Sequence, residues 1–164
     1  MQAGDIGFSH SAGTVGRAIR TAEMLRFRTG SYWSHVFTLD RPVPGTNDDW
    51  YVIEARAHGV TDDRKLSEIP GKRQITGSPL NIRNSRRGTA LQLQFLRKQV
   101  GARYGFFTIG SIVTTLILPK FINVMLPDTW ICSALAAEAL RCGGYLHDWP
   151  DIYQVTPAQL YEAL

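Results

Sequence analysis

A cysteine near the start of a predicted helix is the first residue in this chain that could do covalent chemistry. Cys132 lies within residues 130–140, which are rich in alanine and leucine and therefore predict a helix. A thiol in the first turn of a helix lies beside the positive end of the helix dipole, which favours the reactive thiolate. The plain alternative is that Cys132 is a small buried core residue, as most free cysteines are.

A cysteine nucleophile needs a base and a group that orients the base, and two predicted strands supply candidates. His35 lies in the apolar segment 34–39, and Glu54 interrupts the apolar segment 50–55. A carboxylate in so apolar a strand is costly unless it is paired. A hairpin that pairs His35 with Glu54 would satisfy both groups and leave the second imidazole nitrogen for a thiol, as in a Cys-His-acid triad. Alternatively, Glu54 marks a solvent face and His35 is a hydrogen-bonded core histidine.

The elements that must position these groups alternate between strands and helices. The predicted strands are residues 4–8, 34–39, 50–55 and 73–82, and the predicted helices are residues 15–25, 89–100, 130–140 and a short segment after Thr156. Segments 34–39 and 50–55 are expected to form an antiparallel hairpin. This order favours an α+β fold in which helices flank a small antiparallel sheet. At 164 residues the chain is expected to form a single domain, residues 1–164.

Four local patterns make these predictions specific. Asp128 or Thr129 is expected to cap the cysteine helix. Helix 89–100 should bury one apolar stripe and end at Gly101. Segment 62–70 is polar and is expected to hold at most one helical turn. Thr156 begins a capping box, with proline at the first helical position of the segment that follows. The members of the predicted stripe are Leu91, Phe95, Leu96 and Val100.

Composition excludes several functional classes. The hydrophobic fraction of 44% and the charged fraction of 20% are those of a globular protein, and the net charge of +4 suits an anionic partner without requiring one. The basic residues are dispersed, so no nucleic-acid-binding surface is expected. His and Cys spacings match no zinc motif, no phosphate-binding glycine loop is present, and no cofactor is expected. His10, His58 and His147 stand among polar residues and are expected at the surface.

The two cysteines and the apolar segments bear on the cellular setting. Cys132 and Cys142 lie ten residues apart, about 15 Å on one helix, which is too far for a disulfide. No signal peptide is recognised at the start of the chain, so the default expectation is a cytoplasmic protein. The apolar run 106–118 is too short for a membrane span, and it is expected either in the core or in peripheral contact with lipid.

Several short motifs occur in a fixed order along nearly the whole chain. They are residues 4–8 (GDIGF), 34–36 (SHV), 52–55 (VIEA) with 59–60 (GV), 101–106 (GARYGF), 130–135 (WICSAL) and 155–160 (VTPAQL). Together they resemble the circularly permuted branch of the papain-like cysteine hydrolases, relatives of the NlpC-type cell-wall peptidases, and are similar to the YiiX-like proteins. In the unpermuted relatives the cysteine precedes the histidine, so a cysteine that comes last points to the permuted branch.

The resemblance implies a papain-like sheet packed against helices and a thiol hydrolase without a cofactor. It implies that Cys132 is the nucleophile, His35 the base and Glu54 the residue that orients the base. Backbone N–H groups near Cys132 are expected to hold the oxyanion, and the substrate or oxyanion candidates are Tyr104, Tyr32, Ser133, Trp33 and Trp130. The two tryptophans adjoin the proposed catalytic positions, and each is expected either in the core or lining a cleft.

Three functions remain open from the sequence. The first is hydrolysis of an amide bond in a peptide or in a peptidoglycan peptide, which resemblance favours and which would require release or delivery of the protein to the cell wall. The second is hydrolysis or transfer of a lipid acyl group, including a lipid amide, which the apolar run 106–118 favours. The third is a non-catalytic module that binds a peptide or lipid in a degenerate site.

Overall fold

The computed structural model describes residues 1–10, 17, 20–21, 32–79, 82, 84–105, 129–145, 149 and 151–164. The strands in this part of the chain are β1 (Ile6–Ser9), β2 (His35–Pro42), β3 (Trp50–Arg56), β4 (Gly59–Lys65), β5 (Arg73–Ile75), β6 (Arg103–Tyr104) and β7 (Thr129–Trp130). The helices are α3 (Arg86–Gln99), α5 (Cys132–Cys142) and α6 (Pro157–Ala163), with 3-10 turns η1 (Leu66–Glu68) and η2 (Ile152–Gln154). The predicted α+β class is therefore confirmed.

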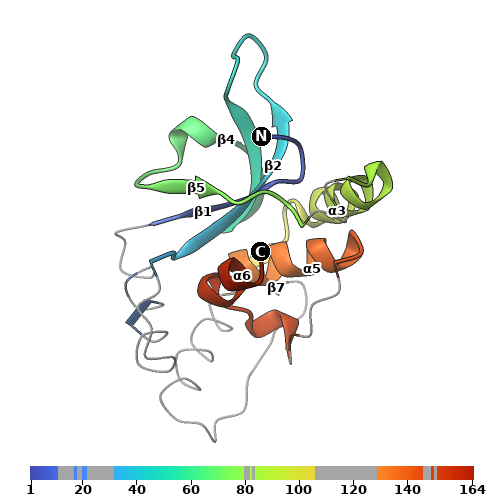
Figure 1. Ribbon diagram of the computed structural model, residues 1–164. Coiled ribbons are helices and arrows are strands. Elements are labelled where there is room, and N and C mark those ends of the chain that lie inside the picture. Colours follow the sequence, from blue (N-terminus) through green and yellow to red (C-terminus); the bar gives the residue numbers. More distant parts are fainter. Residues whose placement is uncertain are drawn as a thin grey trace, which may run out of the picture.

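Five antiparallel strands form the main sheet, in the order β4-β3-β2-β1-β5 (Figure 1). The predicted hairpin of β2 and β3 is at its centre, with Thr38 opposite Ile53 and Leu39 opposite Val52. The short strands β6 and β7 form a separate parallel pair, in which Tyr104 lies opposite Trp130. Residues 103–104 and 129–130 are thus joined beside the start of α5.

Alternate residues of β2 and β3 divide between two apolar clusters because successive side chains of a strand point to opposite faces. Val36 and Ile53 pack in the large cluster that also contains residues of α3, α5 and α6. Phe37 and Val52 pack in a smaller cluster with Ile69. The three helices therefore cover one face of the sheet, as Figure 1 shows.

Small residues let α5 pack closely against its neighbours. Every residue of α5 from Cys132 to Leu140 is buried. A side chain at Gly88 of α3 would not fit, because its Cβ would lie 2.8 Å from the carbonyl oxygen of Gly143. The alanine-rich composition that predicted a helix thus also explains how this helix lies deep in the core.

The predicted helix over residues 89–100 is confirmed, and its predicted buried stripe is confirmed for Leu96 and Phe95 but wrong for Leu91 and Val100. Leu91 and Val100 are 41% and 40% exposed, whereas Gln92 is fully buried. The amide of Gln92 donates to the carbonyl oxygen of Gly4 at 2.9 Å. This bond to a distant part of the chain turns Gln92 inward and leaves Leu91 in solvent.

Two other local predictions need correction. The single helical turn predicted within segment 62–70 is present as the 3-10 turn η1, but the first part of the segment continues β4 as far as Lys65, which was not predicted. The N-cap of α5 is neither Asp128 nor Thr129 but Ile131, whose apolar side chain accepts no hydrogen bond. Thr129 lies in β7 instead, and Asp128 lies outside the described residues.

Other predictions are confirmed or lie outside the description. Thr156 and Gln159 form the predicted capping box of α6. Both cysteines are free, as their separation on α5 predicts. Most of the predicted helix 15–25 and all of the apolar run 106–118 lie outside the described residues. Within the described ranges, no helix is both long and apolar enough to cross a bilayer.

An ion pair between the buried carboxylate of Asp40 and the exposed side chain of Arg97 joins the sheet to α3 and carries a stability prediction. Asp40 of β2 has a side chain only 1% exposed, and its Oδ1 accepts from Arg97 Nε at 2.9 Å and lies 2.7 Å from Arg97 Nη2. Arg97→Met should lower the free energy of unfolding by about 1–2 kcal/mol, because it removes a charged hydrogen bond and an ion pair from a buried carboxylate. The change is measured by urea denaturation.

Lys98→Met provides the matched control. Lys98 is the next residue of α3 and is exposed. Removing its charge should change stability by no more than about 0.5 kcal/mol. Equal urea midpoints for the two variants would show that the Asp40–Arg97 pair contributes nothing.

Candidate active site

The buried carboxylate of Glu54 is bonded to His35, as the sequence predicts. Glu54 Oε2 lies 2.5 Å from His35 Nε2, and the Glu54 side chain is 0% exposed. The two residues come from the neighbouring strands β3 and β2, with His35 at the first position of its strand. Glu54 is thus paired rather than facing solvent.

Cys132 completes the arrangement from a third element. It is the first residue of α5, and it lies close enough to His35 to raise the pKa of the imidazole. Because Glu54 occupies Nε2, the other ring nitrogen, Nδ1, is the one that remains for the thiol. Cys132 is 5% exposed and the His35 side chain 17% exposed, so the pair is mostly shielded from solvent.

The electrostatics of this cluster favour a charged histidine. Burial by itself lowers the pKa of His35. Hydrogen bonding to Cys132 and Glu54 raises the pKa, and so does the negative charge of each group when it is ionised. The net effect is a rise in the pKa of His35 from 6.5 to about 10. Burial opposes ionisation of Glu54 too, yet the bond to His35 and the charge of Arg64 lower its pKa below the ordinary 4.5. At neutral pH, His35 is therefore a cation bonded to an ionised carboxylate.

Tyr104 lies close enough to Cys132 to be affected by its charge. Burial and the negative charge of ionised Cys132 raise the pKa of Tyr104 above the ordinary 10.0, so the phenol keeps its proton. Its position follows from the backbone: β6 pairs with β7, and the chain passes from Trp130 through Ile131 directly to Cys132. A protonated phenol beside the thiol is a possible hydrogen-bond donor to a reacting oxygen.

Trp33 and Tyr32 precede His35 and differ in exposure. Trp33 is 8% exposed, and its ring lies 6.2 Å from that of Phe8 and 5.7 Å from that of Tyr161. Tyr32 is 45% exposed, with its ring edge-on to Trp33 at 4.9 Å. Trp33 is therefore a core residue behind His35, while Tyr32 can meet a ligand from solvent.

Trp130 and Ser133 flank Cys132 but are engaged elsewhere. The Trp130 indole N–H donates to Gln99 Oε1 at 2.9 Å, and the residue is 9% exposed. The Ser133 hydroxyl donates to the carbonyl oxygen of Val155 at 2.5 Å. Both side chains thus hold the start of α5 in place, and the group that Ser133 could offer an oxyanion is its backbone N–H.

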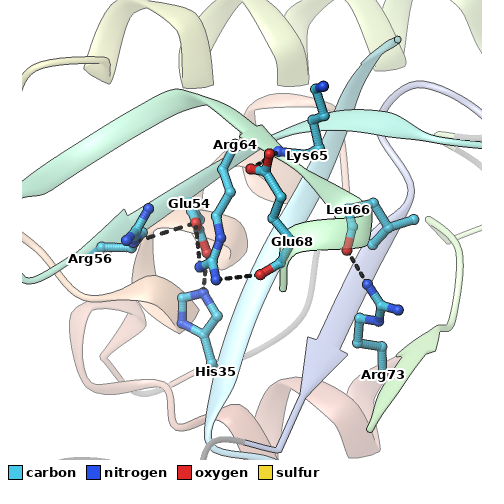
Figure 2. A network of polar contacts seen from close by, with 8 residues as sticks. All are labelled: His35, Glu54, Arg56, Arg64, Lys65, Leu66, Glu68 and Arg73. Carbon is cyan, nitrogen blue, oxygen red and sulfur yellow. Dashed lines mark hydrogen bonds and ion pairs between the residues drawn. The ribbon is translucent and has the colours of Figure 1, made fainter. Parts of the chain in front are cut away.

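Arg64 and Arg56 belong to the cluster but were not predicted from the sequence. Figure 2 shows His35, Arg56 and Arg64 converging on Glu54. Arg64 Nη1 donates to Glu54 Oε1 at 3.2 Å, and Arg56 Nε lies 3.6 Å from the same oxygen. The only sequence signal was the need to neutralise a buried carboxylate, which does not specify the second partner.

The remaining titratable candidates form no second site in the described part of the chain. His10 Nδ1 is hydrogen-bonded to the carbonyl oxygen of Tyr32 at 2.7 Å, His58 is exposed, and His147 lies outside the described residues. No group of three or more His, Cys, Asp or Glu residues suited to a metal ion occurs among the described residues.

Comparison with known proteins adds no assignment. No protein-family model matches the chain, and a search of curated proteins gives no significant match.

The charge of His35 can be tested by NMR. We expect the ring to keep its proton to about pH 10 in the folded protein and to titrate at 6.5 in the urea-denatured chain. Because folding strengthens proton binding, the linked stability is fully present below pH 6.5 and is lost as the pH rises through about 10. Long-range 1H–15N spectra recorded across a pH titration measure the pKa directly.

Cys132→Ala isolates the contribution of the thiol to this titration. It removes the strongest interaction that raises the pKa of His35 while burial continues to lower it, so the pKa should fall well below 10. Cys142→Ala removes the other thiol and should leave the titration of His35 unchanged. If Cys132→Ala also leaves it unchanged, Cys132 is not in contact with the ring.

Proposed function

We propose that the protein is a cysteine hydrolase that cleaves an amide bond through Cys132, His35 and Glu54. The observation that carries the proposal is that α5, β2 and β3 bring these three residues together: His35 is bonded to Glu54 and lies close enough to Cys132 for the thiol to raise its pKa. Each has the chemical type that its role needs: a thiol nucleophile, an imidazole base and an ionised carboxylate that fixes the base. Glu54 and His35 are also too buried to be explained as a surface ion pair.

The start of α5 offers a site for the oxyanion. The first N–H groups of a helix lack partners within the helix. At the N-cap of α5, Ile131 has no side-chain group to accept from them. The backbone N–H groups of Cys132 and Ser133 can therefore stabilise a negative oxygen formed beside the thiol, with the Tyr104 hydroxyl as a further donor.

The proposed reaction proceeds through an acyl-enzyme. The Cys132 thiolate forms a bond to the carbonyl carbon, and the carbonyl π electrons move to the oxygen. Collapse of this intermediate breaks the C–N bond, and the leaving amine takes a proton from His35. Water then gives a proton to His35 and attacks the thioester, releasing the acid and restoring the thiolate beside the imidazolium.

The permuted papain-like architecture and the substrate class belong to this proposal. The order of motifs supports the first: a strand histidine and a strand acid precede the helix cysteine. Resemblance to the NlpC-type peptidases makes a peptide, in particular a peptidoglycan peptide, the leading substrate.

Lipid acyl hydrolysis or transfer is the second candidate. It is supported by the apolar sequence 106–118, which follows directly after the GARYG motif containing Tyr104. In this case the run would contact a membrane peripherally and deliver an acyl chain or lipid amide to Cys132. Vesicle binding that is lost when residues 106–118 are made polar would favour this candidate.

Alkylation tests the nucleophile without knowledge of the substrate. Cys132 is buried and Cys142 only half-buried, so exposure alone predicts faster labelling of Cys142. We expect iodoacetamide at neutral pH to modify Cys132 faster, because thiolate beside His35 is the reactive form. Site-resolved mass spectrometry over time measures both rates, and His35→Ala should abolish the preference. Slower labelling of Cys132 than of Cys142 in the wild type would contradict an activated thiolate.

Turnover is tested with purified peptidoglycan. We expect release of peptide fragments, detected by mass spectrometry, with His35→Ala reducing the rate by about 10²- to 10⁴-fold. Cys132→Ala should remove activity, while Cys142→Ala should retain it. If vesicle lipids are cleaved instead, the lipid candidate is correct. Binding of either ligand with no turnover would identify a binding module and overturn the hydrolase.

A further inference from the structure

Arg64 of β4 holds the carboxylate oxygen of Glu54 that His35 does not use. Arg64 Nη1 donates to Glu54 Oε1 at 3.2 Å, while Glu54 Oε2 is bonded to His35. The second end of the same guanidinium, Nη2, donates to the backbone carbonyl oxygen of Glu68 at 2.8 Å. Figure 2 shows Arg64 lying between these two acceptors.

The hydrogen bond to Glu68 restrains the position of the Arg64 guanidinium. Glu68 is the last residue of η1, which follows β4 directly. The Arg64 side chain is 18% exposed and bonded at both ends of its planar head, a geometry that suits arginine and that a single ammonium group does not reproduce.

Arg56 provides an internal comparison. It is the other guanidinium beside Glu54 Oε1, at 3.6 Å, and its side chain is 39% exposed. It therefore supplies charge at longer range, whereas Arg64 supplies charge together with a hydrogen bond of defined direction. A carboxylate held at both oxygens has little freedom to rotate away from the imidazole.

We propose that Arg64 is a positioning residue that fixes the Glu54 carboxylate, and through it the ring of His35, for reaction at Cys132. The proposal rests on the proposed hydrolase function. Arg64 belongs neither to the sequence motifs nor to the three catalytic candidates, so the proposal adds a residue of β4 to the site. Arg64 acts through Glu54 and is not expected to touch substrate.

The surrounding charges determine the direction of the pH effect. The groups that face the Glu54 carboxylate are His35 on β2, Arg64 on β4 and Arg56 on the same strand as Glu54, β3. His35 in turn faces Cys132 from α5, which also influences Tyr104. Since Arg64 helps to lower the pKa of Glu54, its removal should raise that pKa and move the acid limb of reactivity to higher pH.

The test follows the alkylation rate of Cys132 between pH 4 and 9, because this readout needs no substrate. Arg64→Met should reduce the rate at neutral pH by about 10- to 100-fold, as expected when a reacting side chain loses its orientation. The acid limb should also shift upward. Arg64→Lys keeps the charge but cannot bond both acceptors, so it should give a smaller rate loss and a smaller shift.

Two control variants separate position from charge. Arg87→Met removes one charge from an exposed position of α3 and should leave the profile unchanged. Arg56→Met removes the more distant cation beside Glu54 and should have a smaller effect than Arg64→Met. Far-UV circular dichroism and urea denaturation establish that each variant is folded before its rates are compared.

A double-mutant cycle with Glu54→Gln decides whether Arg64 acts through Glu54. If it does, Arg64→Met should slow the Glu54→Gln protein by less than twofold. A full effect of Arg64→Met in that background would overturn the proposal. If Arg64→Met does not fold, Arg64→Lys decides: a wild-type rate and pH profile in that variant would also overturn it.

The outcome distinguishes this inference from the proposed function. If wild-type Cys132 reacts no faster than Cys142, the hydrolase proposal fails and Arg64 has no reaction to support. If wild-type Cys132 reacts quickly, His35→Ala abolishes this and Arg64→Lys and Arg64→Met react like wild type, only the role of Arg64 fails.

Discussion

The buried carboxylate of Glu54 is the constraint on which the arrangement of the central strands depends. A charge without solvent must be compensated by nearby groups, and here the compensation comes from both neighbours of β3. His35 lies on β2 and Arg64 on β4, at 2.5 Å and 3.2 Å from different oxygens of the carboxylate. A shift of either strand by one residue would turn its partner to the other face and leave the charge unpaired. The polar network therefore fixes the register of strands that apolar packing alone would hold less specifically.

A second feature of the arrangement is the start of α5, which places the thiol of Cys132 beside His35 at the beginning of β2 although the helix has no polar N-cap. Its N-cap is Ile131 rather than a polar residue, so capping contributes nothing to its position. The start of the helix is held instead by the pairing of Tyr104 with Trp130 and by the bond from Ser133 to Val155. Tertiary contacts thus replace a local cap, and the side chain of the N-cap residue accepts no bond from the first N–H groups of the helix.

The pairing of His35 with Glu54 could be predicted from the sequence, because a charged residue within an apolar strand needs a partner. The contacts of Arg64 and Gln92 could not be predicted, because their partners are set by the register of the sheet or lie far away in the chain. Glu54 in an apolar strand demanded a cation, and the nearest strand offered His35 across a short hairpin. Arg64 could not be selected in the same way, because an irregularity in the β3–β4 register between Val52 and Glu54 changes which β4 residue reaches the carboxylate. Gln92 was missed because its acceptor, the carbonyl of Gly4, lies 88 residues away in the chain. Periodicity identifies a helix, but it does not identify a buried polar partner on another element.

The two buried acids of β2 and β3 differ in a way that bears on function. Asp40 pairs with Arg41 and Arg97, whose side chains are about half exposed, so this pair joins sheet to helix at the protein surface. Glu54 pairs with a histidine that is itself mostly buried and lies beside a thiol. Replacing such an interior ionic group with apolar residues is often neutral or stabilising, so stability alone gives no reason for it. A titratable ring held between an ionised carboxylate and a thiol does have a chemical use, and the proposed reactivity of Cys132 would account for its place in the core.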